Sequence, residues 1–458
     1  MLEVKFYDTV DDSLLKFAVI ISQSNGKWVF CKRKERDTYE APGGHREVGE
    51  DILETAKREL QEETGAIQFD INPICVYSVT GKNSVNETGE ETFGLLCFAE
   101  IRGFSGQLDR EMEKVVLMDE LPQNWTYPLI QPKLIEEWQK RQAWGDIERN
   151  KEWKKIQKIT KGWSADQKYK ILTKRGEALL LRLADIDNYD KKKKEFDIIT
   201  KYSKLGIPMS MPIEFGVCNQ NKSVYMILTW VEGQDLETVL SDLPENEQYA
   251  LGRLAGDILK KIHSIPVEEK DIPANTKEDK KILQLSRYES SNVRVTNDEI
   301  AVKYVKENIH KIWKEKPVYQ HGDFHPGNLI YMENGEIGVI DFNRWEVGDP
   351  YEEFYKLESF ARELSVPYCI GQIQSYFNDD IPEDFWRILA VYVAHASLFS
   401  IKWAEKFGRT DIDAMVERCK VAFEDYDYLE ELHQCGIKNN EYVVKGLKDI
   451  CYEFSVNK

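Results

Sequence analysis

One segment constrains the N-terminal part of the chain most strongly. It reads GHREVGEDILETAKRELQEETG from Gly44 to Gly65, a helical pattern bounded by glycine with acidic residues at fixed offsets. On a helix, Glu59, Glu62 and Glu63 stand at i, i+3 and i+4, so their carboxylates share an arc of about 100°. Like charges at this spacing destabilise a bare helix, and a hard divalent cation removes the repulsion. The spacing therefore predicts a site for Mg²⁺ or Mn²⁺.

The same helix carries a second, apolar stripe. Leu53, Ala56 and Leu60 lie beside the carboxylates, a pattern that is typical of a helix packed on a sheet. Strand-like runs that could form this sheet occupy residues 12–34, 73–80, 92–101 and 113–118. A solvated surface helix is the alternative interpretation of any Glu-rich helix taken alone.

The segment resembles the signature of Nudix hydrolases, which is G, five residues, E, seven residues and then REUxEExGU, with U an aliphatic residue. The matching positions are Gly44, Glu50, Arg58, Glu59, Leu60, Glu62, Glu63 and Gly65. Only Ala66 departs, because it is smaller than the usual aliphatic residue. The resemblance implies an αβα sandwich over residues 1–145 that hydrolyses a nucleoside di- or triphosphate-type substrate with a divalent metal.

The resemblance also assigns roles by position. It implies that the metal ligands are Glu59, Glu62, Glu63 and the backbone carbonyl of Gly43, with Glu59 also catalytic. It implies an ion pair between Glu50 and Arg58 that braces the loop against the helix. As a further acidic ligand or base after the last strand, Glu113 is preferred over Glu111. Residues 120–134 are similar to the tail of Nudix enzymes that act on nucleoside triphosphates or on 5′-triphosphate ends of RNA.

A second segment carries different chemistry. HGDFHPGN runs from His321 to Asn328, and the strand-like IGVIDF that follows contains Asp341. Phosphoryl transfer to a hydroxyl needs a carboxylate that accepts the alcohol proton, and an Asn and a second Asp that hold Mg²⁺. Two alternatives stay open. His321, Asp323 and His325 alternate and could bind a metal from one face of a strand, or the segment could belong to an inactive kinase-like binding module.

This second segment resembles the aminoglycoside phosphotransferase family, whose pattern is HGDxxxxN followed by an Asp-Phe pair. The resemblance covers about residues 155–458 and implies a bilobal protein-kinase-like fold, with an N-lobe at about 161–233 and a mainly helical C-lobe at about 234–458. It implies that Asp323 is the catalytic base, that Asn328 and Asp341 bind metal, and that His321 holds the loop through ring-to-backbone hydrogen bonds. ATP or GTP would be the phosphoryl donor and a small hydroxylated compound the acceptor.

The resemblance implies a nucleotide site further upstream. Arg182 stands where the family has its phosphate-binding base, usually Lys, and Glu195 stands where its partner belongs. Ser164 would lie near the phosphates. The stretch TWVEG, which contains Thr229 and Val231, would be the hinge that receives the adenine. The run of residues 191–194 is four lysines, and we expect a solvated helix face there with at most one Lys near phosphate.

Length, charge and composition limit the classes of function that the chain could have. The 458 residues suit two or three domains, and a net charge of −18 offers no basic face for long nucleic acid. The eight cysteines form no metal-binding cluster or disulfide framework, and no membrane span or signal peptide is expected, so we expect a cytoplasmic chain. The highly charged residues 131–160 predict a helix, with 146–160 as a helical linker before a kinase domain at 161–458.

These features predict an α+β chain of two domains and a bifunctional enzyme, a Nudix hydrolase joined to a phosphotransferase. A regulatory protein that senses a nucleotide at one domain without turnover is the alternative function. Product formation separates the two, because a sensor would bind the nucleotide without releasing monophosphate or pyrophosphate.

Overall fold

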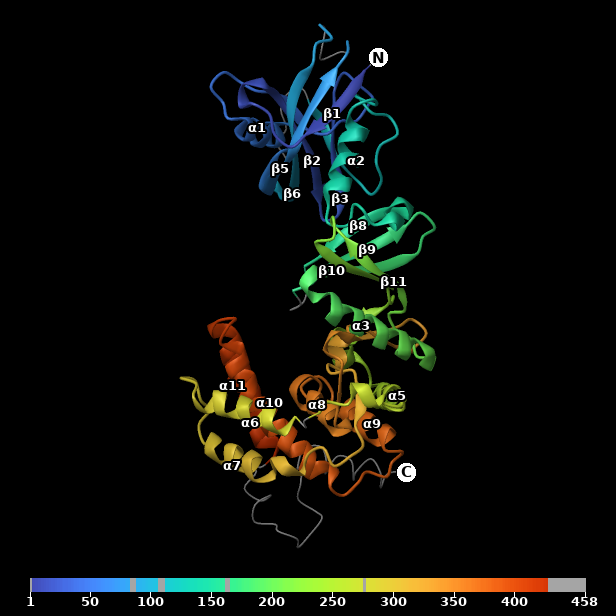
Figure 1. Ribbon diagram of the computed structural model, residues 1–458, viewed down its shortest axis with the longest axis vertical. Coiled ribbons are helices and arrows are strands. Elements are labelled where there is room, and N and C mark those ends of the chain that lie inside the picture. Colours follow the sequence, from blue (N-terminus) through green and yellow to red (C-terminus); the bar gives the residue numbers. More distant parts are fainter. Residues whose placement is uncertain (1, 83–87, 106–111, 161–164, 275–276, 427–458) are drawn as a thin grey trace. The chain divides into compact units, whose positions relative to one another are not determined.

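The chain is described by a computed structural model that covers residues 2–82, 88–105, 112–160, 165–274 and 277–426 (Figure 1). It divides into two compact units. The first takes Met1–Lys192 with Ile213–Thr229, and the second takes Lys193–Pro212 with Trp230–Lys458. Both helices and sheets are present, so the prediction of a two-domain chain of mixed α and β structure is confirmed.

A mixed sheet forms the N-terminal domain. Its order is β1-β5-β6-β2-β3-β7 with β4 paired to β2, and only β2 and β6 run parallel among the pairs of this sheet. The strands are β1 (Glu3–Tyr7), β2 (Leu15–Ser24), β3 (Lys27–Arg33), β4 (Gly43–His45), β5 (Ala66–Thr80), β6 (Thr92–Phe104) and β7 (Met112–Met118).

One helix covers each face of this sheet. Helix α1 (Ile52–Thr64) packs Ile52, Ala56 and Leu60 against residues such as Ile20 of β2. Helix α2 (Gln131–Arg141) packs Leu134, Ile135 and Trp138 against alternate residues such as Ile21. Because neighbouring strand residues point to opposite faces, the two cores lie on opposite sides of the sheet, as in the predicted αβα sandwich (Figure 1).

Local signals fix both ends of α1. The Asp51 side chain accepts a hydrogen bond from the backbone N–H of Leu53 and caps the first turn. Gly65 ends the helix with φ 69°, a left-handed conformation that glycine adopts without steric cost. The helix predicted from the signature is therefore confirmed, and its register sets the directions of the three carboxylates.

A five-stranded sheet completes the first unit, and it corrects the predicted linker. Residues 153–159 form strand β8 (Trp153–Ile159), the edge of the sheet β11-β12-β10-β9-β8. The high density of charged residues suggested a helix. In the structure the lysines lie on an edge strand, where charged side chains discourage pairing with other chains. The other strands are β9 (Gln167–Thr173), β10 (Ala178–Asp185), β11 (Pro212–Cys218) and β12 (Ser223–Thr229).

The segment between α2 and β8 is packed and is not a solvated linker. Trp144 and Ile147 are buried in the core of the five-stranded sheet. The Trp144 ring also lies 6.3 Å from the ring of Trp138 and 5.7 Å from that of Trp153. Asp119, at the end of β7, binds Lys155 of β8 at 2.7 Å. These contacts explain why the five-stranded sheet groups with the N-terminal domain in one unit.

The second unit is mainly helical. Helix α3 (Tyr189–Tyr202) carries the division between the units, after Lys192. The other helices are α4 (Leu236–Val239), α5 (Glu245–His263), α6 (Glu278–Glu289), α7 (Asp298–Asn308), α8 (Tyr355–Phe360), α9 (Val366–Tyr376), α10 (Phe385–Ala404) and α11 (Arg409–Asp425). Short strands are β13 (Gln234–Asp235), β14 (Val318–Gln320), β15 (Leu329–Tyr331), β16 (Ile337–Val339) and β17 (Glu346–Gly348).

Two expectations about composition can be compared with this fold. Six cysteines are free and buried in the described part of the chain, in agreement with the predicted absence of a disulfide framework. Within the same part of the chain, every helix is too short or too polar to span a bilayer.

Candidate active sites

Arg58 is the centre of the acidic face of α1. Its guanidinium binds Glu50 at 3.0 Å, as the signature predicts, and it also binds Glu59 at 2.7 Å and Glu62 at 3.1 Å. The same group donates to the backbone carbonyl of His45 at 3.0 Å. The hydrogen bond from Arg58 holds the pKa of Glu50 at about 2. One arginine therefore ties the loop to the helix and neutralises two of the three predicted metal ligands.

Glu63 is the most deeply placed of the three carboxylates. Its side chain is 6% exposed, and it accepts hydrogen bonds from the backbone N–H of Gly43 and from Arg33, both at 3.0 Å. Burial raises the pKa of Glu63 to about 7 and also raises that of Glu59. A Cβ at Gly44 would lie 2.2 Å from a Glu59 oxygen, so a larger residue there would displace the Glu59 carboxylate.

The donor set on α1 suits a hard divalent cation. It consists of carboxylate oxygens whose mutual repulsion and burial a bound cation would relieve. The described residues, however, contain no group of three acidic, histidine or cysteine side chains close enough to share one ion. The reason is that Glu59 and Glu62 contact Arg58, whereas Glu63 contacts Arg33 and Gly43. Metal binding would require Arg58 to release these two carboxylates.

The structure does not place Glu113 with the α1 carboxylates. Glu113 binds Lys32 at 2.9 Å, and this hydrogen bond lowers its pKa. Cys31 and Arg33 of the same strand both contact Glu63, so the intervening Lys32 points to the other face of the sheet. Glu113 is thus held by Lys32, and its role as a base at this site stays a prediction. Its alternative, Glu111, lies outside the described residues.

In the second unit, His321 holds the HGD loop as predicted. Its Nε2–H donates to the backbone carbonyl of Ile340 at 3.1 Å, and its Nδ1 accepts from the backbone N–H of Asp323 at 3.2 Å. Burial lowers the pKa of His321, which keeps the ring neutral. Both ring nitrogens of His321 form hydrogen bonds with the backbone. The alternative of a metal bound by His321, Asp323 and His325 is therefore not supported.

Asp323 lies in a cationic environment. Nζ of Lys356, from α8, is 2.5 Å from its Oδ1, and Nε of Arg344 is 3.4 Å from its Oδ2. The Asp323 side chain is 17% exposed, whereas that of Lys356 is only 4% exposed. Burial alone would raise the pKa of Asp323, but the charge of Lys356 lowers it to about 2. The carboxylate is thus ionised at neutral pH.

The predicted metal ligands follow Asp323 closely. Nδ2 of Asn328 donates to the backbone carbonyl of Asp323 at 2.9 Å. The backbone N–H of Ile340 donates to the carbonyl of Asn328 at 3.1 Å, which brings Asp341 next to the loop. Asp341 has φ 61°, a left-handed conformation at the end of β16. An amide oxygen and a carboxylate suit Mg²⁺, so this donor set fits the predicted metal.

Two residues of this site had no role in the sequence prediction. Glu353 accepts a hydrogen bond from the backbone N–H of Gly322 at 2.5 Å, and Lys356 binds Asp323. Burial raises the pKa of Glu353 to about 7. The nearby Asp349 side chain accepts instead from the backbone N–H groups of Trp313 and Tyr351 and from the Tyr392 hydroxyl. No local sequence pattern links Glu353 or Lys356 to the HGD loop.

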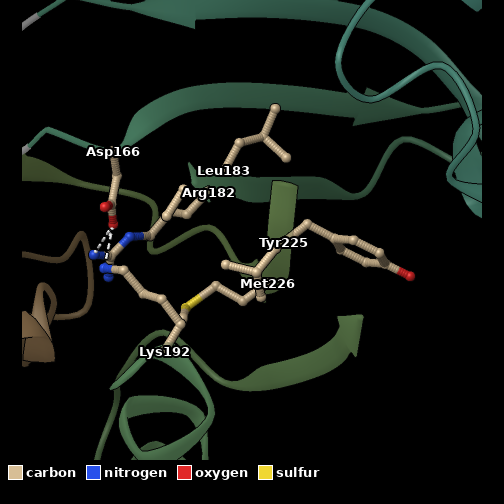
Figure 2. Close-up of a pocket in the computed structure, with 8 residues that line it drawn as sticks. Asp166, Arg182, Leu183, Lys192, Tyr225 and Met226 are labelled. Carbon is tan, nitrogen blue, oxygen red and sulfur yellow. Dashed lines mark hydrogen bonds and ion pairs between the residues drawn. The ribbon is translucent and has the colours of Figure 1, made fainter. Parts of the chain in front are cut away.

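The predicted nucleotide residues are placed as follows. Arg182 lies on β10 and binds Asp166 at 2.6 Å, and Lys192 on α3 binds the same oxygen at 2.6 Å (Figure 2). Lys192 is buried, whereas Lys191, Lys193 and Lys194 are not, in line with a solvated face from which at most one lysine departs. Glu195, three residues further along α3, is also buried. Ser164 lies outside the described residues.

The hinge prediction falls at a natural division of the fold. The first unit ends at Thr229 and the second resumes at Trp230. The side chain of Val231 packs closely on Gly338 of β16. A Cβ atom placed on Gly338 would lie only 2.4 Å from Cγ1 of Val231. The segment therefore joins the five-stranded sheet to the strand that leads to Asp341.

Comparison with known proteins adds two matches. Residues 155–387 match the phosphotransferase enzyme family, and residues 13–137 match the NUDIX domain. The putative 8-oxo-dGTP diphosphatase YtkD of Bacillus subtilis (strain 168) is 33% identical over 123 residues, which cover 27% of this chain and 73% of that protein. Aminoglycoside 3′-phosphotransferase of Salmonella typhimurium is 30% identical over 164 residues, 34% of this chain and 59% of that protein.

A solved structure shows a related fold. A mutant of aminoglycoside 2′-phosphotransferase-IIIa, in its GDP complex, has a TM-score of 0.50 at 14% identity and covers 63% of this chain and 96% of that chain.

Proposed function

Since the chain belongs to the NUDIX domain family over residues 13–137 and to the phosphotransferase enzyme family over residues 155–387, we propose that it is a bifunctional enzyme with two metal-dependent sites. The N-terminal domain hydrolyses a nucleoside triphosphate-type substrate. The C-terminal domain transfers a phosphoryl group from ATP or GTP to the hydroxyl of a small molecule. The geometry around Asp323 is the observation that carries the second activity.

At the N-terminal site, the α1 carboxylates would hold Mg²⁺ or Mn²⁺, with the carbonyl of Gly43 as a further ligand. The metal would activate water and polarise the phosphate. Arg58 binds Glu59 and Glu62 and would keep only its ion pair with Glu50 when the metal binds. The relative from Bacillus subtilis is named for 8-oxo-dGTP, which makes oxidised and ordinary purine triphosphates the first substrates to test.

At the C-terminal site, Asp323 would accept the proton of the acceptor hydroxyl. Lys356 and the neighbouring Asn328 fix its carboxyl group and backbone, so the base is held in place before the acceptor binds. Asn328 and Asp341 would hold Mg²⁺, which neutralises charge on the transferred phosphate. Thr229 and Val231 would receive the base of the nucleotide, and Arg182 with Glu195 would serve its phosphates.

The test is a screen of the purified chain with Mg²⁺. The first arm offers 8-oxo-dGTP, dGTP and 5′-triphosphorylated RNA, and measures release of pyrophosphate or phosphate. The second arm offers ATP or GTP with aminoglycosides, macrolides, choline-like alcohols and sugars, and measures the phosphorylated product. Turnover in both arms is the expected result. Binding without any product would overturn the proposal in favour of the nucleotide sensor.

A further inference from the structure

Two cations of the first unit converge on one carboxylate oxygen. Nη2 of Arg182, from β10, and Nζ of Lys192, from α3, each lie 2.6 Å from Oδ2 of Asp166 (Figure 2). The three side chains are 3%, 9% and 8% exposed, respectively. Burial alone would raise the pKa of Asp166, yet Arg182 and Lys192 hold it below its ordinary value.

This arrangement has the chemistry of a phosphate site. A guanidinium on a strand and an ammonium on a helix aim their N–H donors at one point, and both groups form strong charge-assisted bonds with phosphate oxygens. The depression around these cations is lined also by Leu183, Val224 and Met226, and it leaves no room for a water molecule. A phosphate could therefore contact both cations only if Asp166 moved away.

Asp166 is placed so that it could move. It stands one residue before β9, outside the regular strand, next to the segment predicted to lie near the nucleotide phosphates. Arg182 is in the middle of β10, paired to β9 and β12, and Lys192 is on a helix. The cations are thus held by regular structure, whereas their anion lies in a bend just before β9.

We propose that Lys192 and Arg182 together bind the phosphates of the nucleotide donor, and that Asp166 fills this position as an internal anion that the nucleotide displaces. The inference rests on the proposed use of ATP or GTP by the C-terminal domain. It adds a second cation to the site and a competitor that lowers the affinity for nucleotide.

Calorimetric titration of the full chain with Mg·ATP and Mg·GTP tests the inference through opposite effects. We expect Lys192→Met to weaken binding roughly tenfold or more, the loss typical of a charged hydrogen bond, and Lys192→Arg to retain most of the affinity. We expect Asp166→Asn to tighten binding several-fold, because the competing charge is gone. Lys193→Met is the matched control, since Lys193 is exposed and pairs with Asp197.

The outcomes separate this inference from the proposed function. If the wild-type chain binds neither nucleotide, the proposed donor is wrong and the inference falls with it. If the wild type binds and Lys192→Met binds equally well, only the inference is overturned. If Asp166→Asn weakens binding as Lys192→Met does, the three residues form a structural ion pair and the inference is again overturned. Should Asp166→Asn fail to fold, the three lysine variants decide the question.

Discussion

The two sites compensate their charges over different distances along the chain. On α1, Arg58 binds Glu50, Glu59 and Glu62, all within eight residues of it. In the C-terminal domain, Asp323 is bound by Lys356, 33 residues later, and its loop is braced by Glu353. At the first site Arg58 pairs with two of the three carboxylates on its own helix, and only Glu63 pairs with a distant residue, Arg33. At the second site the predicted base itself depends on an element that meets it only after folding. We expect substitutions to have local effects in the first and wider effects in the second.

The largest effect is expected for the base of the second site. Asp323→Asn should lower phosphoryl transfer by about 10²–10⁴-fold, because a positioned base contributes this much to proton transfer. Its affinity for Mg·ATP should stay close to wild type, since the altered group faces the hydroxyl. Asp341→Ala should instead weaken nucleotide binding, because a metal ligand is lost. A transfer assay beside calorimetric titration measures both quantities, and normal transfer by Asp323→Asn would refute the kinase interpretation.

Removing Lys356, the cation that binds Asp323, should destabilise the fold. Lys356→Met leaves Asp323 buried without its closest positive charge, and breaking a buried ion pair in this way costs about 3–5 kcal/mol. Arg58→Met should cost only about 1 kcal/mol, because the Arg58 side chain is 24% exposed, against 4% for Lys356, and its ion pairs are partly solvated. Urea unfolding of the two variants compares these values. Equal losses would show that the difference between the sites is not one of burial.

A pH effect should appear at the second site. The pKa of Glu353 is about 7 in the folded chain against an ordinary 4.5, so the folded state keeps a proton that the unfolded state loses. Its contribution to stability is therefore present below about pH 4.5 and falls as the pH rises to 7, by roughly 3 kcal/mol in total.

Glu353→Gln should remove this part of the pH dependence and still accept the bond from Gly322. Calorimetric unfolding of both chains at pH 5, 6 and 7 measures it. If the free energy of unfolding changes equally with pH in the wild type and in Glu353→Gln, Glu353 is not protonated in the folded chain.

The smallest effect is expected on α1. Glu62→Gln removes one ligand charge from a site with three carboxylates and should reduce Mg²⁺-dependent hydrolysis by roughly 10–100-fold, with the phosphotransferase unchanged. Glu54→Gln is the control, because Glu54 lies on the same helix and contacts only the exposed Lys57 among its ion pairs. Hydrolysis at the wild-type rate by Glu62→Gln would show that this residue is not a ligand.

The sequence predicted what regular spacing determines. The two stripes of α1 follow from its repeat and its end from Gly65, whereas the Glu50–Arg58 pair was implied by the resemblance to the Nudix signature; the structure has all of them. His321 was also assigned correctly, because its loop motif is short and local. Lys356 and Glu353 were not predicted, since no local pattern shows which later helix will pack on the HGD loop.

The errors have a common physical origin. The charged residues before Ile159 suggested a helix, but an exposed edge strand carries the same composition. Which of the four lysines at 191–194 would leave the solvated face was not predicted, because the contact of Lys192 with Asp166 depends on the segment before β9. Glu113 was assigned from its position in the chain, and its ion pair with Lys32 was not predicted, because it depends on the pairing of β3 with β7.

The row of indole rings formed by Trp138, Trp144 and Trp153 has an optical consequence. Neighbouring rings are 6.3 Å and 5.7 Å apart, which is close enough for excitation energy to pass between them. Excitation absorbed on α2 is therefore shared with β8 within this row, which holds three of the eleven tryptophans of the chain. Replacing Trp144 with phenylalanine would remove the middle ring and weaken the transfer between α2 and β8.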